Sequence, residues 1–260
     1  MDATINNAPI LEVRGLTKRF AGLTAVRNLN LDLRGGEIFG LIGPNGSGKS
    51  TAMKAIMGIE RPTAGEVLFQ GENIAGMPAH KIARKGFGMV FQHSRPLNRQ
   101  TVLENIMVAL LPDSLFMLFA DSSLTERAKW IANRVGLGAV MHRRPPTLPF
   151  ADLRRLELAK AIARDPKVVL VDEPFAGLTL AEVGTFSALI SSFREEGRAV
   201  LLVDHNVKSV AALVDRVLAM YLGEESRHRP CRRGDAQRDG APGLSRWSHR
   251  ELGSARDQLP

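Results

Sequence analysis

A glycine-rich run from Gly43 to Thr51 constrains the fold of this chain more than any other feature. Its sequence, GPNGSGKST, fits the pattern G-x-x-x-x-G-K-[ST], which forms a loop whose backbone N–H groups surround phosphate oxygens. An apolar, strand-like segment at residues 38–42 precedes the run, and a helix-like segment at residues 52–57 follows it. A glycine-rich turn that matched the pattern by chance would not be expected to lie between a strand and a helix. The run therefore predicts an α/β fold with a nucleoside triphosphate site.

The residue types in this loop indicate how it would hold the nucleotide. Its glycines let the backbone turn N–H groups inward, and the following helix directs its positive N-terminal end at the same anion. Lys49 is long enough to reach the β- and γ-phosphates, and the Ser50 hydroxyl can complete the coordination of Mg²⁺. The predicted nucleotide-binding residues of the loop are Gly43, Pro44, Asn45, Gly46, Ser47, Gly48, Lys49, Ser50 and Thr51.

Two carboxylates, Asp172 and Glu173, follow a continuous apolar run at residues 168–171. Such a run is typical of a buried parallel strand, and ligands bind at the C-terminal ends of these strands in open α/β sheets. Asp172 is placed to hold Mg²⁺, and Glu173 to accept a proton from the attacking water. Another apolar run, at residues 199–203, leads to His205. This histidine either contacts the γ-phosphate or is only a satisfied polar residue at a strand end.

Together these motifs resemble those of the nucleotide-binding subunits of ABC transporters. Residues 43–51 match the Walker A motif of that family, and residues 168–173 match its Walker B motif with the catalytic glutamate. The resemblance covers the chain from about Ile10 to Gly223. It implies an ATPase that uses ATP and Mg²⁺, with the P-loop NTPase ABC ATPase fold. That fold is α/β, with a mixed sheet core, an N-terminal antiparallel β subdomain and a helical subdomain.

Three further residues match functional positions of this family. Gln92 matches the Q-loop glutamine, which helps to hold Mg²⁺ and senses the γ-phosphate, and His205 matches the switch histidine. Phe20 occupies the position of the aromatic residue that stacks on adenine, although a core phenylalanine would look identical in sequence. The resemblance therefore assigns catalysis to Glu173, His205 and Gln92, and Mg²⁺ binding to Ser50, Asp172 and Gln92.

Within the family, the sequence is most similar to ATP-binding subunits of branched-chain amino acid importers. The similarity lies in Gln92-His93, Leu97 and residues 101–105, 154–159 and 176–178. It implies transmembrane permease subunits, a second ATP-binding subunit (identical or not) and, indirectly, a periplasmic solute-binding protein as partners. The surface from Gln92 to about Ala120 is expected to meet the transmembrane subunits, at the cytoplasmic face of the inner membrane.

Hydrophobic spacing adds to this picture of the fold. The alternation at residues 26–33 predicts a half-exposed antiparallel strand near the N-terminus. From about His93 to Asp165 no strand-like run occurs, and apolar residues such as Leu156 fall at helical spacing. We therefore expect one ABC ATPase domain at residues 1–223, with its helical subdomain at about 93–165.

Composition narrows the possible partners. A net charge of +8 suits a phosphate-binding protein at an anionic membrane face, and no helix-turn-helix or aromatic–basic pattern favours nucleic acid. The most apolar stretch, residues 106–120, is interrupted by Pro112 and Asp113 and is too short to span a bilayer. The N-terminus lacks the apolar segment of a secretion signal, and the single cysteine, Cys231, excludes an internal disulfide framework. We expect a peripheral protein in the cytosol.

The segment that should carry the ABC signature, usually L-S-G-G-Q, departs from the family. Residues 148–153 read L-P-F-A-D-L. In the family, the signature serine and glycine N–H groups bind the γ-phosphate of ATP held by the partner subunit. Pro149 has neither a hydroxyl nor an N–H, although a proline in the first turn still permits the helix. Thr179 likewise replaces an Asp or Asn that is common in the next loop. Two interpretations of the altered signature remain: sequence drift that leaves the function intact, and a real loss of activity.

The tail, residues 224–260, is the second departure. The family continues there with a short strand and a closing helix, whereas this segment is rich in Arg, Gly and Pro and poor in apolar residues. That composition predicts disorder. If residues 227–244 are written as GC-rich codons and the DNA is read one base later, the new frame can encode ATGLADEVMR followed by ETVRRVY. That sequence resembles the C-terminal segment of the family, which is missing here. We therefore favour a frameshift near Glu224, with a genuine basic, disordered tail as the alternative.

The sequence thus predicts an ATP-binding and ATP-hydrolysing subunit that powers a bacterial ABC importer, for branched-chain amino acids or similar small polar solutes. One alternative is an ABC ATPase outside transport, although such proteins normally carry two cassettes in one chain. The other is a nucleotide-binding but inactive, frameshifted product.

Overall fold

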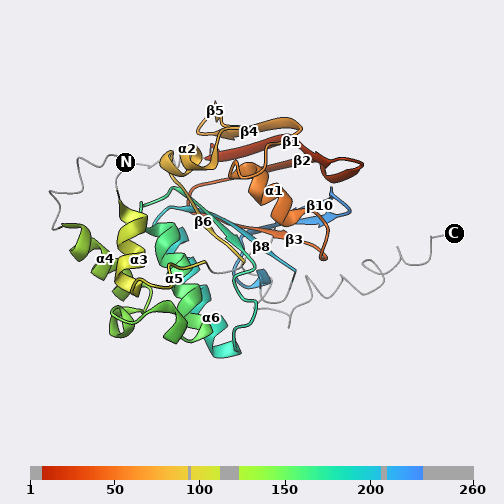
Figure 1. The fold of residues 1–260 in the computed structure, drawn as a ribbon. Coiled ribbons are helices and arrows are strands. Elements are labelled where there is room, and N and C mark those ends of the chain that lie inside the picture. Colours follow the sequence, from red (N-terminus) through yellow and green to blue (C-terminus); the bar gives the residue numbers. More distant parts are fainter. Residues whose placement is uncertain (1–7, 93–94, 112–122, 206–209, 231–260) are drawn as a thin grey trace, which may run out of the picture.

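Two sheets with helices packed against them make up this computed structural model, which describes residues 8–92, 95–111, 123–205 and 210–230 (Figure 1). A six-stranded sheet has the order β10-β9-β3-β8-β7-β6, and an antiparallel four-stranded sheet has the order β2-β1-β4-β5. In the larger sheet, β9, β3, β8, β7 and β6 are parallel and only β10 is antiparallel. The expected α/β class with a mixed sheet and an N-terminal antiparallel β unit is confirmed. The strands are β1 (Leu11–Phe20), β2 (Leu23–Leu33), β3 (Ile38–Ile42), β4 (Ala64–Phe69), β5 (Glu72–Asn73), β6 (Phe87–Val90), β7 (Val168–Asp172), β8 (Ala199–Asp204), β9 (Arg216–Tyr221) and β10 (Glu224–Pro230).

The larger sheet is buried on both faces. Alternate side chains of β7 point in opposite directions: Val169 and Val171 pack toward helices α3–α6, whereas Val168 and Leu170 pack toward α1 and the smaller sheet. Figure 1 shows this layering, with the smaller sheet and α1 above the larger sheet and α3, α4, α5 and α6 below it. A strand covered on both faces has no polar side, and this explains the uninterrupted apolar run. The helices are α1 (Lys49–Ile56), α2 (Ala79–Arg84), α3 (Val102–Leu110), α4 (Ser123–Arg134), α5 (Phe150–Ile162) and α6 (Leu180–Glu195).

The regular structure described between the strands β6 and β7 is all helical, and loops connect it. Residues 95–111 and 123–165 contain α3, α4, α5 and two short 3₁₀ turns, with no strand among them. Residues 112–122, which include Leu115, Phe116 and Leu118 of the expected docking surface, lie outside the described residues. Within the described ranges, no helix combines the length and apolar character that crossing a membrane requires.

Pro149 and Thr179, the two residues that differ from the family pattern in and after the signature, each precede a regular helix. Pro149 is the N-cap of α5, and its carbonyl accepts hydrogen bonds from the N–H groups of Asp152 and Leu153 at 3.1 Å. Thr179 is the N-cap of α6, where its hydroxyl and the Glu182 carboxylate form a reciprocal capping box. A threonine caps a helix nearly as well as an aspartate or asparagine. Thr179 therefore gives α6 a capped N-terminus.

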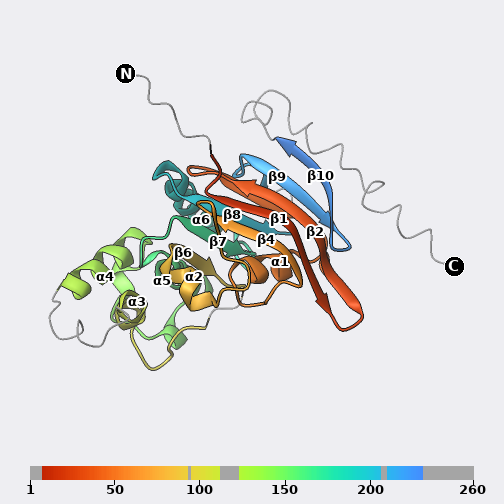
Figure 2. The same ribbon diagram turned by 90° about the horizontal axis from the view of Figure 1, so that it is seen from above.

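The beginning of the tail differs from the expectation of disorder. Glu224–Pro230 forms strand β10, seven residues long and paired antiparallel to β9, and it lies beside β2 (Figure 2). An exposed ion pair joins Arg27 on β2 to Glu224 on β10 at 3.0 Å. Backbone pairing to a preceding strand does not need apolar side chains, which is why composition failed to predict this strand. The rest of the tail, residues 231–260, lies outside the described residues.

Candidate active site

The loop between β3 and α1 adopts a conformation that only glycine permits at two positions. Gly43 and Gly48 have φ angles of 154° and 98°. A Cβ on Gly43 would lie 2.2 Å from the carbonyl oxygen of Met220, and one on Gly48 would lie 2.2 Å from that of Ala25. The loop is therefore pressed against the end of β9 and the start of β2, and larger residues at 43 or 48 would displace it.

Lys49 lies inside the loop. Its Nζ donates hydrogen bonds to the carbonyl oxygens of Gly43 at 2.7 Å and Pro44 at 2.9 Å. Burial lowers the pKa of Lys49, whereas the nearby carboxylates of Glu173 and Asp172 favour its charged form and oppose that change. Phosphate oxygens of a bound nucleotide would replace these carbonyl oxygens as acceptors of the Lys49 ammonium. A charged acceptor forms a stronger hydrogen bond with this cation than a neutral carbonyl does.

Ser50 and Asp172 meet across the loop, and both offer oxygen ligands. The Ser50 Oγ donates to Asp172 Oδ1 at 3.2 Å. Burial raises the pKa of Asp172, and the hydrogen bond from Ser50 lowers it. A hydroxyl and a carboxylate are hard oxygen donors of the type that Mg²⁺ takes together with water and phosphate oxygens. These two residues fit the expected Mg²⁺, which would neutralise phosphate charge when bound.

Glu173 is contacted by both residues predicted to sense the γ-phosphate. Its Oε2 accepts a hydrogen bond from Gln92 Nε2 at 2.6 Å, and its Oε1 lies 3.5 Å from His205 Nδ1. The three side chains follow β7, β6 and β8, which are neighbouring parallel strands whose carboxyl ends meet at one edge of the sheet. Glu173 has a φ of 45°, and its N–H donates to the Val203 carbonyl at 2.8 Å. Backbone strain of this kind is concentrated at functional sites.

A cavity of about 530 Å³ connects the loop to the expected adenine position. Phe20 forms part of its wall and is exposed, with the Lys18 ammonium 4.6 Å from the ring centroid. The structure therefore brings Phe20 to the same cavity as Lys49, Gln92 and Glu173. His205 reaches this site through Glu173. The cavity is lined by Phe20, Leu23, Thr24, Ala25, Asn45, Gly46, Gly48, Lys49, Ser50, Thr51, Gln92, Glu173, Leu222 and Gly223.

Sequence reasoning missed the turn between β9 and β10, which supplies Leu222 and Gly223 to the cavity. The Gly223 N–H donates to the Ser47 carbonyl of the phosphate loop at 3.1 Å, and the Gly223 carbonyl accepts from the N–H of Arg27 at 2.7 Å. Leu222 is 74% exposed and has a φ of 48°. The only sequence signal for this turn is Tyr-Leu-Gly after an apolar strand. That signal does not reveal that Leu222 and Phe20 line the same cavity.

We expect Leu222→Ala to weaken ATP binding about fivefold, because roughly 1 kcal/mol of apolar contact with the base would be lost. Binding of inorganic triphosphate, which has no base, should stay unchanged. Titration calorimetry with both ligands measures the difference. Leu180→Ala is the matched control, since Leu180 is exposed but does not line the cavity. Equal losses for ATP and triphosphate would mean that Leu222 acts through the loop and not on the base.

A phosphate loop between a strand and a helix, with a carboxylate pair at the end of a neighbouring parallel strand, defines an ATP-binding cassette of the P-loop class. Solved cassettes share the fold. A nucleotide-free ATP-binding cassette from an ABC transporter matches with a TM-score of 0.77 and 25% identity, over 85% of this chain and 91% of that one. A bacterial ABC transporter cassette solved as a dimer matches with a TM-score of 0.76 and 25% identity, over 85% and 99%.

The sequence profile of the ABC transporter family matches residues 26–176, and the chain belongs to this family. The high-affinity branched-chain amino acid transport ATP-binding protein LivG of Escherichia coli is 36% identical, over 83% of this chain and 89% of LivG. BraF of Pseudomonas aeruginosa, which has the same description, shows the same identity and coverage. The ribose import ATP-binding protein RbsA 3 of Rubrobacter xylanophilus is 34% identical over 83% of this chain and 43% of its own length. The protein is an ATPase of the ABC class that uses ATP and Mg²⁺.

Proposed function

We propose that this chain is the ATP-hydrolysing subunit of a bacterial importer for branched-chain amino acids or similar small polar solutes. The observation that carries the proposal is its 36% identity to LivG and BraF, extending over 89% of the length of those transport ATP-binding proteins. Its partners would be permease subunits in the membrane and a second ATP-binding subunit, with a periplasmic solute-binding protein acting through the permease. The chain would then work at the cytoplasmic face of the inner membrane.

The contacts in the site support a specific division of roles. Lys49 neutralises phosphate charge, and Ser50 and Asp172 hold Mg²⁺. Glu173 takes the proton from the attacking water, because its carboxylate is the acceptor at the centre of the contacts from Gln92 and His205. Those two residues respond to the γ-phosphate, and Gln92 also reaches the metal. The base is held by Phe20, and the phosphates by Gly43, Pro44, Asn45, Gly46, Ser47, Gly48, Lys49, Ser50 and Thr51.

Residues 1–223 form the catalytic domain in this proposal, with its helical subdomain at about 93–165. For the remaining residues, 224–260, we propose a frameshift near Glu224. Mass spectrometry of the protein from its native host tests it. A C-terminal peptide with the sequence ATGLADEVMR supports a shifted reading frame, and peptides from residues 231–260 would contradict it.

A groove beside Gln92 supports the docking of a permease segment at this side of the molecule. It has a volume of about 690 Å³ and lies between α1, α2, β6 and α5. Its wall combines the exposed apolar side chains of Ile59 and Phe91 with the cationic side chains of Lys54, Arg95 and Arg164. An exposed apolar groove with a basic rim fits an amphipathic protein segment that carries acidic residues. Gln92, Arg95 and Ala109, which belong to the proposed docking surface, line this groove.

We expect Ile59→Asp to abolish solute-coupled transport while ATP binding by the isolated chain stays within twofold of the wild type. A carboxylate in the groove would oppose the burial of an apolar segment there. Trp130→Asp is the control, because Trp130 on α4 is also an exposed apolar residue, at 59% against 42% for Ile59, but does not line the groove. Uptake into cells and nucleotide titration measure the two effects. Unchanged transport in the Ile59→Asp variant would exclude this groove as the docking site.

The function itself is tested by reconstitution. The chain would be incorporated into proteoliposomes with candidate permease subunits from the same organism, and ATP hydrolysis measured with a solute-binding protein and leucine, or with ribose. Stimulation by leucine supports the proposal, whereas stimulation by ribose assigns another solute. Steady hydrolysis that no membrane subunit changes would indicate an ABC ATPase outside transport, and no hydrolysis in any mixture would indicate an inactive product.

A further inference from the structure

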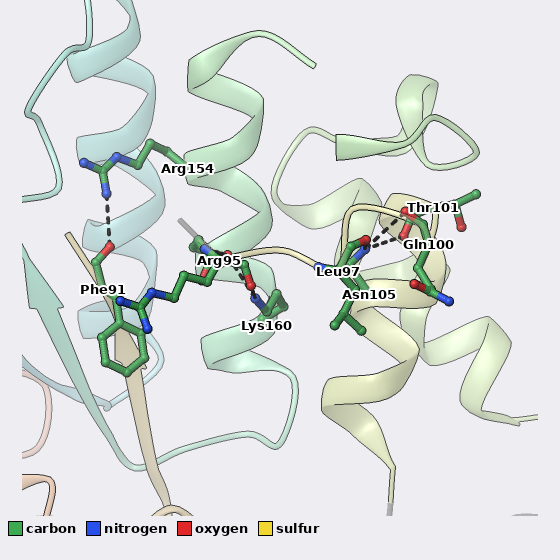
Figure 3. A network of polar contacts seen from close by, with 9 residues as sticks. Phe91, Arg95, Leu97, Gln100, Thr101, Asn105, Arg154 and Lys160 are labelled. Carbon is green, nitrogen blue, oxygen red and sulfur yellow. Dashed lines mark hydrogen bonds and ion pairs between the residues drawn. The ribbon is translucent and has the colours of Figure 1, made fainter. Parts of the chain in front are cut away.

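The segment between β6 and α3 is held by buried polar side chains that the nucleotide site does not use. Asn105, Arg154 and Glu157 are all buried, and each bonds to the main chain of residues 91–101 (Figure 3). Burying polar or charged groups costs free energy unless their hydrogen bonds are made. Three such groups directed at one irregular segment indicate that the position of this segment matters. Gln92 lies at its start.

Helix α5 binds the start of the segment. The Arg154 Nη1 donates to the Phe91 carbonyl at 3.0 Å, and the Glu157 Oε1 accepts from the Arg95 N–H at 3.2 Å. Lys160 reinforces the second contact, because its Nζ donates to Glu157 at 2.9 Å and to the Arg95 carbonyl at 3.3 Å. Gln92 thus lies between two main-chain anchors that come from the same helix.

Asn105 of α3 binds the far end of the segment. Its Oδ1 accepts from the Leu97 N–H at 2.8 Å, and its Nδ2 donates to the carbonyls of Leu97 at 3.1 Å and Thr101 at 2.8 Å. Asn105 therefore attaches Leu97 and Thr101 to α3. The contact nearest to Gln92 is the one that Arg154 makes.

Arg154 also touches the start of its own helix. Its guanidinium lies 5.1 Å from the centroid of the Phe150 ring, and that ring packs against Gly177, where an added Cβ would lie 2.9 Å from Phe150 Cε1. Gly177 belongs to the loop that follows Glu173. Arg154 is 2% exposed and is therefore fixed on both sides, by the Phe91 carbonyl and by the Phe150 ring.

We propose that Arg154 is a positioning residue for ATP hydrolysis: by holding the Phe91 carbonyl, it keeps the Gln92 amide on the Glu173 carboxylate and so sets the orientation of the general base. This inference rests on the roles proposed above for Gln92 and Glu173. The chain of contacts runs from the Arg154 guanidinium through the Phe91–Gln92 peptide to the 2.6 Å hydrogen bond on Glu173. Arg154 itself does not line the nucleotide cavity.

Arg154→Met is expected to lower kcat for ATP hydrolysis about tenfold, as the loss of one hydrogen bond to an oriented group would do, while KM for ATP changes less than twofold. Arg154→Lys, which keeps the charge and a donor, should recover part of the rate. Arg155→Met is the matched control, because Arg155 is the next residue on α5 and forms its hydrogen bond and ion pair with Asp152 on its own helix, not with the main chain beside Gln92. It should leave kcat unchanged. All variants are made in the full chain, and thermal unfolding shows that they are folded.

A double-mutant cycle with Gln92→Ala separates positioning from general stability. If Arg154 acts through Gln92, Arg154→Met should slow the Gln92→Ala enzyme no further. An equal loss of kcat in both backgrounds, or equal effects of Arg154→Met and Arg155→Met, would overturn the inference while leaving the proposed function intact. If Gln92→Ala alone left kcat unchanged, the role proposed for Gln92 would fail first. Should Arg154→Met not fold, the same cycle is run with Arg154→Lys.

Discussion

Glu173→Gln is expected to lower kcat for ATP hydrolysis by a factor of about 10² to 10⁴, the usual contribution of a general base. Glutamine keeps the size of the side chain and can still accept the hydrogen bond from Gln92, but it cannot take a proton from water. ATP should therefore bind as before, and the ATP-bound dimer should accumulate. Phosphate release measures the rate, and size-exclusion chromatography with ATP measures the dimer.

The matched control is Glu195→Gln, which removes a carboxylate from an exposed position near the end of α6. It should leave both readouts unchanged, because Glu195 is remote from the residues that line the nucleotide cavity. Lys49→Ala gives the complementary result, since it should weaken ATP binding itself. Near-normal hydrolysis by the Glu173→Gln protein would remove Glu173 from the role of general base.

Restoring the signature should increase turnover at the site to which Pro149 contributes. Pro149→Ser with Ala151→Gly would return the hydroxyl and glycine of the family's signature to the start of α5. The gain is expected to be about 10²- to 10³-fold, the effect of one donor that stabilises transition-state charge, worth about 3–4 kcal/mol. In a heterodimer, the site formed by Lys49 and Glu173 of this chain with the partner's signature would remain the faster one.

To separate the two ATP sites of the heterodimer, ATP hydrolysis is measured with a partner subunit whose own signature has been disabled. Turnover then depends on the site that residues 148–153 of this chain complete. Thermal unfolding is followed in parallel, because glycine at 151 costs the helix about 1 kcal/mol relative to alanine. If the double change leaves turnover unaltered, the N-terminus of α5 already supplies enough electrostatic stabilisation. The unusual signature would then be drift without functional consequence.

Local patterns predicted the parts of this protein that are contiguous in the chain. The phosphate loop at residues 43–51 is a strand, a turn and a helix in direct succession, so its glycine requirements and its lysine are visible in nine letters. The buried strand β7 is visible for the same reason, because a strand covered on both faces must be apolar throughout. The capping contact of Thr179 with Glu182 is apparent only once the start of α6 is known.

Contacts between distant segments were beyond such patterns. Gln92 and Glu173 are separated by 81 residues, and their hydrogen bond exists because β6 and β7 are neighbours in the sheet. Nothing in either segment specifies that order. The turn at Leu222 reaches the nucleotide cavity only through the pairing of β9 with β3. The strand β10 forms from charged residues because pairing with β9 outweighs their weak strand preference.

Arg154 illustrates the same division. In the sequence it is one of several basic residues and part of a run, residues 154–159, that resembles importer subunits. Its burial and its bond to the Phe91 carbonyl, 63 residues away, become visible only when α5 is packed beside β6. Short-range sterics and hydrophobic periodicity thus specify the elements and the phosphate loop, because both depend on neighbours in the chain. The relative positions of Glu173, Gln92 and Arg154 depend on strand order and helix packing, which arise from the summed burial of the whole core.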